Sequence, residues 1–329
     1  MMRRVVVYGS DSGLRVWGQA VNAIPGYEAV WAEYAASSSG PFNPVPLSSM
    51  RSVRRAARDA DAILALSTLL GAAAAVTTRR IPIVAIDIGA VRLVELYGPR
   101  MGRPAAILAR PLAALVALTA AHAAVLDAIA AGPRHARVVH QPASPPAYPW
   151  EPDRYTPYLL CAGSSGRDLA LLCDAARDLT IEVRLIEGGR ELIPARGTRV
   201  PATYPTNIVR YGAVSRQTYL GLLRGATALV HPLPRSDYPV GITVLLDAMA
   251  AGVPVVATDV SSVTEYQGDG TAAIVPAGDA VAMAEAMRRV AGDEPWARSL
   301  SDAGRRHVER IASPAVVGAQ LGAVLRELE

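Results

Sequence analysis

The residues best suited to chemistry lie in the stretch DYPVGITVLLDAMAAGVPVVATD, residues 237–259. Its pattern predicts a loop, an apolar helix, a tight turn and a buried strand. The first N–H groups of a helix lack intrahelical partners, so the backbone of Gly241, Ile242 and Thr243 is suited to binding an anion. Asp247 lies four residues after Thr243, on the same helix face. It could accept both hydroxyls of a ribose whose phosphates sit at the helix start, or be a solvated residue of an amphipathic helix.

A second loop of small residues, GSSGR, closes the predicted strand PYLLCAG. Gly163, Ser164 and Gly166 make a connection in which backbone N–H groups can approach an anion closely. Arg167 stands at the predicted helix start, where a positive charge is unfavourable for the helix dipole. A bound anion accounts for this arginine, and an exposed ion pair with Asp168 is the alternative.

The first strand runs into a similar loop, GSDSG, formed by Gly9, Ser10, Asp11, Ser12 and Gly13. The spacing is not the G-x-G-x-x-G of dinucleotide-binding folds, and no acid closes the next strand in the matching register. A loop that binds an acceptor or a phosphate and a plain tight turn fit these residues equally well.

The chain of 329 residues contains no lysine, so a permanent side-chain cation that meets a phosphate must be an arginine. Residues 1–150 hold 15 arginines and 8 acidic residues, a net charge of +7, and the remainder has a net charge of −3. The basic half suits an anionic partner such as a lipid headgroup, or simply a set of solvated helix faces. The five histidines lack metal-ligand spacing, so we expect no metal. We expect no other cofactor either. The two cysteines fit buried, reduced thiols.

Both halves alternate short β-branched runs with Ala- and Leu-rich helices, which predicts parallel βαβ units. The predicted strands are 3–9, 27–34, 62–67, 81–87, 114–119, 136–141, 157–163, 181–188, 207–212, 227–232, 253–259 and 272–276. A proline-rich connector, residues 141–158, divides the chain. We therefore predict an α/β fold with two doubly wound domains facing across a cleft. The predicted domains are 1–148 and 149–312, with a helix at 313–329 packing back on the first. Ligands should bind at the carboxyl ends of the strands.

The second half resembles a known family in the order of its motifs. The strand and glycine loop NIVRYGAVS precede the strand ALVHP, the loop and helix of residues 237–251, and the strand PVVATD, which a Thr-Glu step follows. This order resembles the retaining glycosyltransferases of family 4, glycosyl transferases group 1, over about residues 156–311. In the first half only the two-domain plan and the glycine loop match. The resemblance implies a GT-B fold of two Rossmann-like domains and a nucleotide sugar donor.

The resemblance also implies roles for single residues of the donor site. The backbone of Gly212, Ala213 and Val214 would face the nucleotide base. The family usually has an arginine and a lysine beside the first loop of this domain. This chain offers Arg167 alone, with Arg235 as a candidate second cation.

The family's two glutamates, eight residues apart, map onto the helix that contains Asp247. The second glutamate typically holds the donor ribose and matches Asp247, which is shorter by a methylene. The first falls at Pro239, where there is no acid. Asp237 is nearest and could substitute from the loop, or the backbone from Val240 to Gly241 could hold the sugar instead.

We therefore predict a retaining glycosyltransferase that moves a sugar from a nucleoside diphosphate sugar to a hydroxyl by front-face attack. Arg167 and Asp237 would act at the donor, while Asp87, at the end of strand 81–87, would orient the acceptor hydroxyl or simply start a turn. The predicted acceptor is a small hydroxylated molecule, a polysaccharide end or a lipid-linked sugar, and not a nucleic acid. We expect a cytoplasmic protein whose basic half could touch a membrane peripherally. Two alternatives stay open: a GT-B nucleotide-binding protein without catalysis, and a dinucleotide-dependent oxidoreductase.

Overall fold

The computed structural model describes residues 2–34, 45, 47–78, 81–87, 90–130, 136–144, 149–163, 166–187, 201–236 and 238–328. The chain divides into two compact units, and we treat each one separately. The first unit comprises Met1–Pro142 together with Ala312–Glu329, and the second comprises Ala143–Ile311. The boundaries predicted from the sequence lie at residues 148 and 312.

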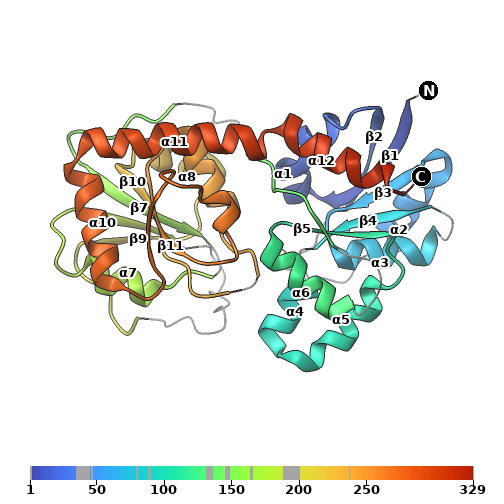
Figure 1. Cartoon of the computed structure of the whole chain (residues 1–329), viewed down its shortest axis with the longest axis horizontal. Helices are drawn as coiled ribbons and strands as arrows, with labels where there is room; N and C mark the ends of the chain where they lie inside the picture. The colour runs from blue at the N-terminus through green and yellow to red at the C-terminus, as the bar shows by residue number, and fades with distance from the viewer. Residues whose placement is uncertain are drawn as a thin grey trace. The chain divides into compact units, whose positions relative to one another are not determined.

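The first unit is built on a parallel sheet in the order β2-β1-β3-β4-β5-β6. Its strands are β1 Arg3–Ser10, β2 Tyr27–Tyr34, β3 Ala62–Ala65, β4 Ile83–Ile86, β5 Ala114–Ala117 and β6 Arg137–Val138. Its helices are α1 Asp11–Asn22, α2 Leu47–Ala56, α3 Thr68–Thr77, α4 Ala90–Tyr97, α5 Gly102–Ala109, α6 Ala120–Ala130 and α12 Pro314–Arg326, with 3-10 turns at Ala57–Asp59 and Pro99–Met101 (Figure 1). The chain order reverses between β1 and β3.

The second unit has a parallel sheet in the order β12-β11-β10-β7-β8-β9. Its strands are β7 Tyr158–Gly163, β8 Glu182–Glu187, β9 Ile208–Tyr211, β10 Ala228–His231, β11 Val255–Asp259 and β12 Ala273–Pro276. Its helices are α7 Leu169–Ala176, α8 Arg216–Gly225, α9 Ile242–Ala251, α10 Ala280–Gly292 and α11 Glu294–Ala312, with a 3-10 turn at Thr264–Tyr266. Here the chain order reverses between β7 and β10, as in a Rossmann sheet.

All twelve predicted strands are present, and the prediction of two doubly wound α/β sheets is confirmed. Every residue of β3, β4 and β10 is buried. Strands covered on both faces must be apolar throughout, which is why their β-branched runs could be located in the sequence. The observed strands are mostly shorter than predicted, and β6 pairs with β5 through Arg137 and Val138 alone.

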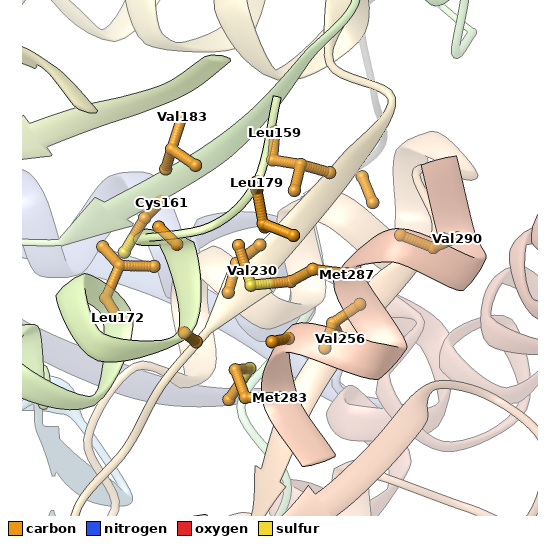
Figure 2. Packing of buried hydrophobic residues seen from close by; sticks show 14 of the residues in the cluster. Leu159, Cys161, Leu172, Leu179, Val183, Val230, Val256, Met283, Met287 and Val290 are labelled. Atoms are coloured by element: carbon orange, nitrogen blue, oxygen red, sulfur yellow. The ribbon is translucent and has the colours of Figure 1, made fainter. Parts of the chain in front are cut away.

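The core of the second unit contains side chains of its sheet and of helices α7 and α10 (Figure 2). Met283 and Met287 of α10 pack into the same cluster as Leu159 of β7. Unbranched methionine side chains adapt well to irregular spaces between a helix and a sheet. Cys161 and Cys173 belong to this cluster, so the prediction that both are buried is confirmed. Burial raises the pKa of the Cys161 thiol to about 12.

Helix α12 returns the end of the chain to the first unit, where it packs along α1 (Figure 1). A β-carbon at Gly318 would lie 2.6 Å from the carbonyl oxygen of Ala20, so this glycine permits the close approach of the two helices. Ser313 is the N-cap of α12 and Pro314 its first residue, a position that proline favours. None of the helices described is long and apolar enough to cross a membrane.

Candidate active site in the second unit

The carboxyl ends of β7 and β10 carry the candidate site. The two strands are parallel neighbours, and the chain order of the sheet reverses between them. Gly163 is the last residue of β7, and His231 is the last residue of β10. Doubly wound sheets bind their ligands at such a reversal, outside the carboxyl ends of the strands. The topology thus brings the loop after β7 and the start of α9 to one place.

Arg167 lies between β7 and α7, one residue before the N-cap of that helix. Asp168 is the N-cap, and its side chain accepts the N–H of Leu171 at 3.0 Å. The Arg167 side chain is only 3% exposed, and its Nε donates to the carbonyl oxygen of Ala162 at 3.0 Å. The alternative of an exposed ion pair between Arg167 and Asp168 is therefore wrong, because the arginine turns inward and the aspartate caps the helix.

Two glycines with positive φ make room for the Arg167 guanidinium. Gly163 has φ +145°, and a β-carbon there would lie 2.6 Å from Cζ of Arg167. Gly241 has φ +80°, and a β-carbon there would lie 2.8 Å from Nη1 of Arg167 and would also collide with Nε2 of His231. Burial lowers the pKa of Arg167, but arginine stays charged at neutral pH. The fold thus holds a buried cation at this strand end.

Helix α9 begins at Ile242 with Gly241 as its N-cap, as predicted. The cap is a glycine, so it has no side chain to satisfy the N–H groups of the first helical turn. Ile242, Leu245, Leu246 and Met249 of α9 are buried and form its core face. The positive end of a helix dipole and the Arg167 guanidinium therefore converge at Gly241, an arrangement that favours an anion.

Replacing Gly241 by alanine should disrupt this convergence. Alanine in the left-handed region costs about 1–2 kcal/mol, and its methyl group would push Arg167 and His231 out of place. Gly278→Ala is the matched control, because Gly278 has φ +86° with nothing within 4 Å of the added carbon. We expect similar backbone strain in both variants, and a loss of about tenfold or more in nucleoside diphosphate affinity only in Gly241→Ala. If calorimetry gave the two variants equal affinities for the nucleoside diphosphate, the result would contradict this geometry.

The sequence placed Asp247 on the face of α9 that it shares with Thr243. In the structure this face is not open at Asp247. Its side chain is 4% exposed, and both carboxylate oxygens bind Arg216, the first residue of α8. The Arg216 guanidinium donates from Nη1 to Oδ2 at 2.5 Å and from Nη2 to Oδ1 at 2.7 Å. Thr243, one turn earlier, is exposed, so the shared face runs from surface to interior. Helix α8 causes the difference, because its first residue covers the carboxylate.

Tyr219 lies beside the same carboxylate and Arg216. Cζ of Arg216 is 5.2 Å from the centre of the Tyr219 ring. Burial, followed by the neighbouring charge of Asp247, raises the pKa of Tyr219 well above its ordinary value. The hydroxyl lies near Asp247 but makes no hydrogen bond within the described part of the chain. Arg216 and Tyr219 are neighbours of Asp247 that the sequence did not reveal.

A family comparison assigns the domain that contains this site. Residues 156–293 match the family model described as Glycosyl transferases group 1. The second unit carries a glycosyl transferases group 1 domain. The match includes Arg167, the N-terminus of α9 and Asp247, and it agrees with the resemblance seen in the sequence.

Solved structures resemble the whole chain, including the part outside the group 1 domain. Sucrose-phosphate synthase from Thermosynechococcus elongatus matches with a TM-score of 0.72 at 14% identity, over 99% of both chains. Anabaena HepE in complex with UDP-glucose matches with a TM-score of 0.70 at 14% identity, over 98% of this chain and 99% of that one. Trehalose 6-phosphate synthase from Burkholderia multivorans matches with a TM-score of 0.66 at 12% identity, over 100% and 99%. At these identities the likeness establishes the GT-B fold.

One curated relative is similar over a short stretch. An exopolysaccharide phosphotransferase of Streptomyces coelicolor is 35% identical over 96 residues. The match spans 28% of this chain and 10% of the relative.

The structure describes most of the other predicted donor residues, but not all of them. Gly212, Ala213 and Val214 connect β9 to α8 and precede Ser215, the N-cap of α8. Val240 is buried and packs on Gly166, since a β-carbon at Gly166 would lie 3.0 Å from Cβ of Val240. Arg235, the candidate second cation, is exposed. Ser164 and Asp237 lie outside the described residues, so their predicted roles stay predictions.

The predicted acceptor loop in the first unit forms a tight strand-to-helix junction. Strand β1 runs through Gly9 to Ser10, and α1 starts at Asp11, so Asp11 and Ser12 are helical rather than looped. The Ser10 hydroxyl accepts the N–H of Gly13 at 3.5 Å. A β-carbon at Gly9 would lie 2.8 Å from Cγ of Leu66, so packing alone requires a glycine there. The tight-turn alternative thus has a structural basis, and acceptor binding stays a prediction.

Asp87 follows β4 and is fully buried in a network of hydrogen bonds. Its oxygens accept from the Thr68 hydroxyl and from the N–H groups of Ala90 at 2.8 Å and Val91 at 3.2 Å. Nε2 of His122 lies 3.0 Å from Oδ2. Burial alone would raise the pKa of Asp87, but His122, Thr68 and Ala90 together lower it. The Asp87 side chain therefore caps the first N–H groups of α4. Its proposed role in orienting an acceptor hydroxyl stays a prediction.

Proposed function

We propose that this protein transfers a sugar from a nucleoside diphosphate sugar to a hydroxyl acceptor, with retention at the anomeric carbon. The supporting observation is the convergence of the Arg167 guanidinium and the N-terminus of α9 at Gly241, inside a glycosyl transferases group 1 domain. Both features stabilise negative charge, and the leaving group of this reaction is a diphosphate. The HepE neighbour was solved with UDP-glucose, which makes UDP the first nucleotide to test here.

The proposed reaction places charge where these groups lie. The bond between the anomeric carbon and the distal phosphate oxygen breaks, and the acceptor oxygen bonds to that carbon on the same face. The acceptor proton passes to the departing phosphate oxygen. Arg167 and the N–H groups of α9 would stabilise the diphosphate as its charge develops. Because a permanent cation already serves the leaving group, we propose that the reaction needs no metal.

Asp247 would bind the donor ribose in this scheme, in competition with Arg216. Both carboxylate oxygens already accept from that guanidinium, so ribose hydroxyls must share the carboxylate or displace the arginine. The Gly212–Val214 segment immediately precedes α8, so the nucleotide base would lie next to the helix that supplies Arg216. We propose that the acceptor, a small hydroxylated molecule, a polysaccharide end or a lipid-linked sugar, binds the first unit. We also propose a cytoplasmic location, with peripheral membrane contact through the basic half.

Asp247→Asn should separate ribose recognition from phosphate recognition. The amide accepts hydrogen bonds less strongly than the carboxylate, so we expect UDP affinity to fall about tenfold. Affinity for inorganic pyrophosphate, which has no ribose, should stay within about twofold of the wild type. Asp259→Asn, which changes an exposed residue at the end of β11 in the same unit, is the control. Parallel losses for both ligands in calorimetry would argue against a ribose contact.

A nucleotide-binding protein without transferase activity is the second candidate. It is favoured by Pro239, a buried residue at the position where the family's first glutamate would stand. The two candidates share the diphosphate site and differ only in turnover. A protein that binds UDP but never releases it from UDP-sugars over long incubation would favour the second.

Thermal shifts with UDP, GDP, TDP and NAD test the shared part of the proposal. A ligand at 100 times its Kd stabilises a fold by about 2.7 kcal/mol, which raises the Tm by several degrees. We expect at least one nucleoside diphosphate to stabilise the protein and NAD to leave it unchanged. Stabilisation by NAD alone would replace this proposal with the oxidoreductase alternative.

A further inference from the structure

His231 is buried without the partners that a buried imidazole needs. It is the last residue of β10 and is 0% exposed. Across the described residues, neither ring nitrogen has a hydrogen-bond partner. More than nine in ten buried polar groups are satisfied, and an unsatisfied one costs stability.

The ring points at the anion site. Nε2 of His231 would collide with a β-carbon at Gly241, and Nη1 of Arg167 would lie 2.8 Å from the same carbon. The imidazole and the guanidinium therefore flank the N-cap of α9. The backbone of Gly241 lies beside the ring and slightly favours its protonation, but not at hydrogen-bond geometry.

Burial, followed by the positive charge of Arg167, holds the pKa of His231 well below its usual range. The ring is therefore neutral at physiological pH and carries one N–H donor. A neutral donor suits this place, because a second cation would be repelled by the guanidinium beside it. The two positive features already present select a ligand group that accepts hydrogen bonds and carries negative charge.

We propose that His231 is a phosphate-binding residue of the donor site, whose N–H donates to an oxygen of the diphosphate held by Arg167 and α9. The inference rests on the proposed function and adds a residue to it. It also gives this lysine-free chain a second side-chain donor beside Arg167. Because the ring has no exposed surface, an oxygen reaches it only if neighbouring groups shift, so ligand binding should change the imidazole signals.

Two variants test this role by calorimetry with UDP and with inorganic pyrophosphate. His231→Phe keeps the bulk of the ring and removes both nitrogens, so its Tm without ligand should equal or exceed that of the wild type. Its affinity for both ligands should fall about 10- to 100-fold, as expected for a lost hydrogen bond to a charged group. His231→Gln retains an N–H donor near the position of Nε2 and should recover part of that affinity.

The imidazole nitrogen spectrum gives a second readout that a packing role would not move. The signals that His231→Phe removes should shift in the wild type when UDP is added. Unchanged affinity in His231→Phe overturns the inference, as does a Tm loss that tracks the affinity loss with no recovery in His231→Gln. These outcomes leave the proposed function intact, whereas a wild-type protein that binds neither ligand would refute both.

Discussion

Replacing Arg167 by methionine should remove nearly all affinity for a nucleoside diphosphate. Methionine fills much of the same space but cannot donate to a phosphate, and charge-assisted bonds to phosphate are among the strongest available. Loss of a bidentate cation contact at a buried site corresponds to about 3 kcal/mol or more, which is over 100-fold in Kd. Calorimetry with UDP, and with GDP and TDP where UDP is weak, measures this change.

Two controls separate the position of Arg167 from its charge. Arg298→Met removes an exposed arginine of the same unit that pairs with Glu294, and it should bind as the wild type does. Arg167→Lys keeps the charge without the planar fork that reaches Ala162 and the two glycines, so it should recover only part of the affinity. If Arg167→Met binds UDP normally, this guanidinium is not the phosphate contact.

Asp87→Asn should destabilise the first unit more than any exposed substitution of the same kind. Nδ1 of His122 accepts the N–H of Leu118 at 3.2 Å, so Nε2 carries the proton and donates to Asp87. Thr68 donates to the other carboxylate oxygen. An amide can accept only one of these bonds, and its NH₂ would face a donor. Leaving a fully buried network half satisfied costs about 2–4 kcal/mol in the free energy of unfolding.

The pH dependence of this effect has a definite sign. The folded-state pKa of Asp87 lies below its ordinary value, which is about 3.9 in an unfolded chain. Its ionised form therefore adds stability above about pH 4, and this contribution is lost as the pH falls through the folded pKa. The difference between wild type and Asp87→Asn in urea unfolding should be full at pH 7 and shrink toward pH 3.

The control for Asp87 is Asp279→Asn, the exposed N-cap of α10, whose side chain accepts the N–H of Ala282 at 2.9 Å. Asparagine caps helices about as well as aspartate, so this change should cost less than about 0.5 kcal/mol. Hydrogen exchange at pH 7 should show faster exchange of the β4 amides in Asp87→Asn alone. Equal costs for the two variants would mean that the Asp87 network contributes no more than a cap.

The sequence was a good guide to the strands and to the start of α9. Buried parallel strands are apolar on both faces, so short runs such as residues 253–259 stand out from amphipathic helices. Gly241 was identified as a helix start because it follows a loop interrupted by prolines, residues 234–240, and precedes an apolar helical run. These signals are local, and they depend on a few neighbouring residues.

The side-chain partners of the site were beyond local signals. Asp247 and Arg216 are 31 residues apart, and their pairing depends on where the fold brings the start of α8. Helical phase placed Asp247 on the same face as Thr243 but could not show that a residue of another helix covers it. The surroundings of His231 could not be predicted locally either, because they depend on the positions of Gly241 and Arg167 in the fold. The Ser215-Arg216 step at a helix start after a glycine loop was the only sequence signal near this pair.

Release of a nucleoside diphosphate from a nucleotide sugar is the most direct test of the central claim. The full chain is incubated with UDP-glucose and a panel of other UDP-, GDP- and TDP-sugars, and the products are quantified by mass spectrometry. We predict that the wild type forms the diphosphate from at least one donor, through transfer or slow hydrolysis, and that Arg167→Met forms none above background. Release at equal rates by both proteins, or by neither with any donor, would contradict the account.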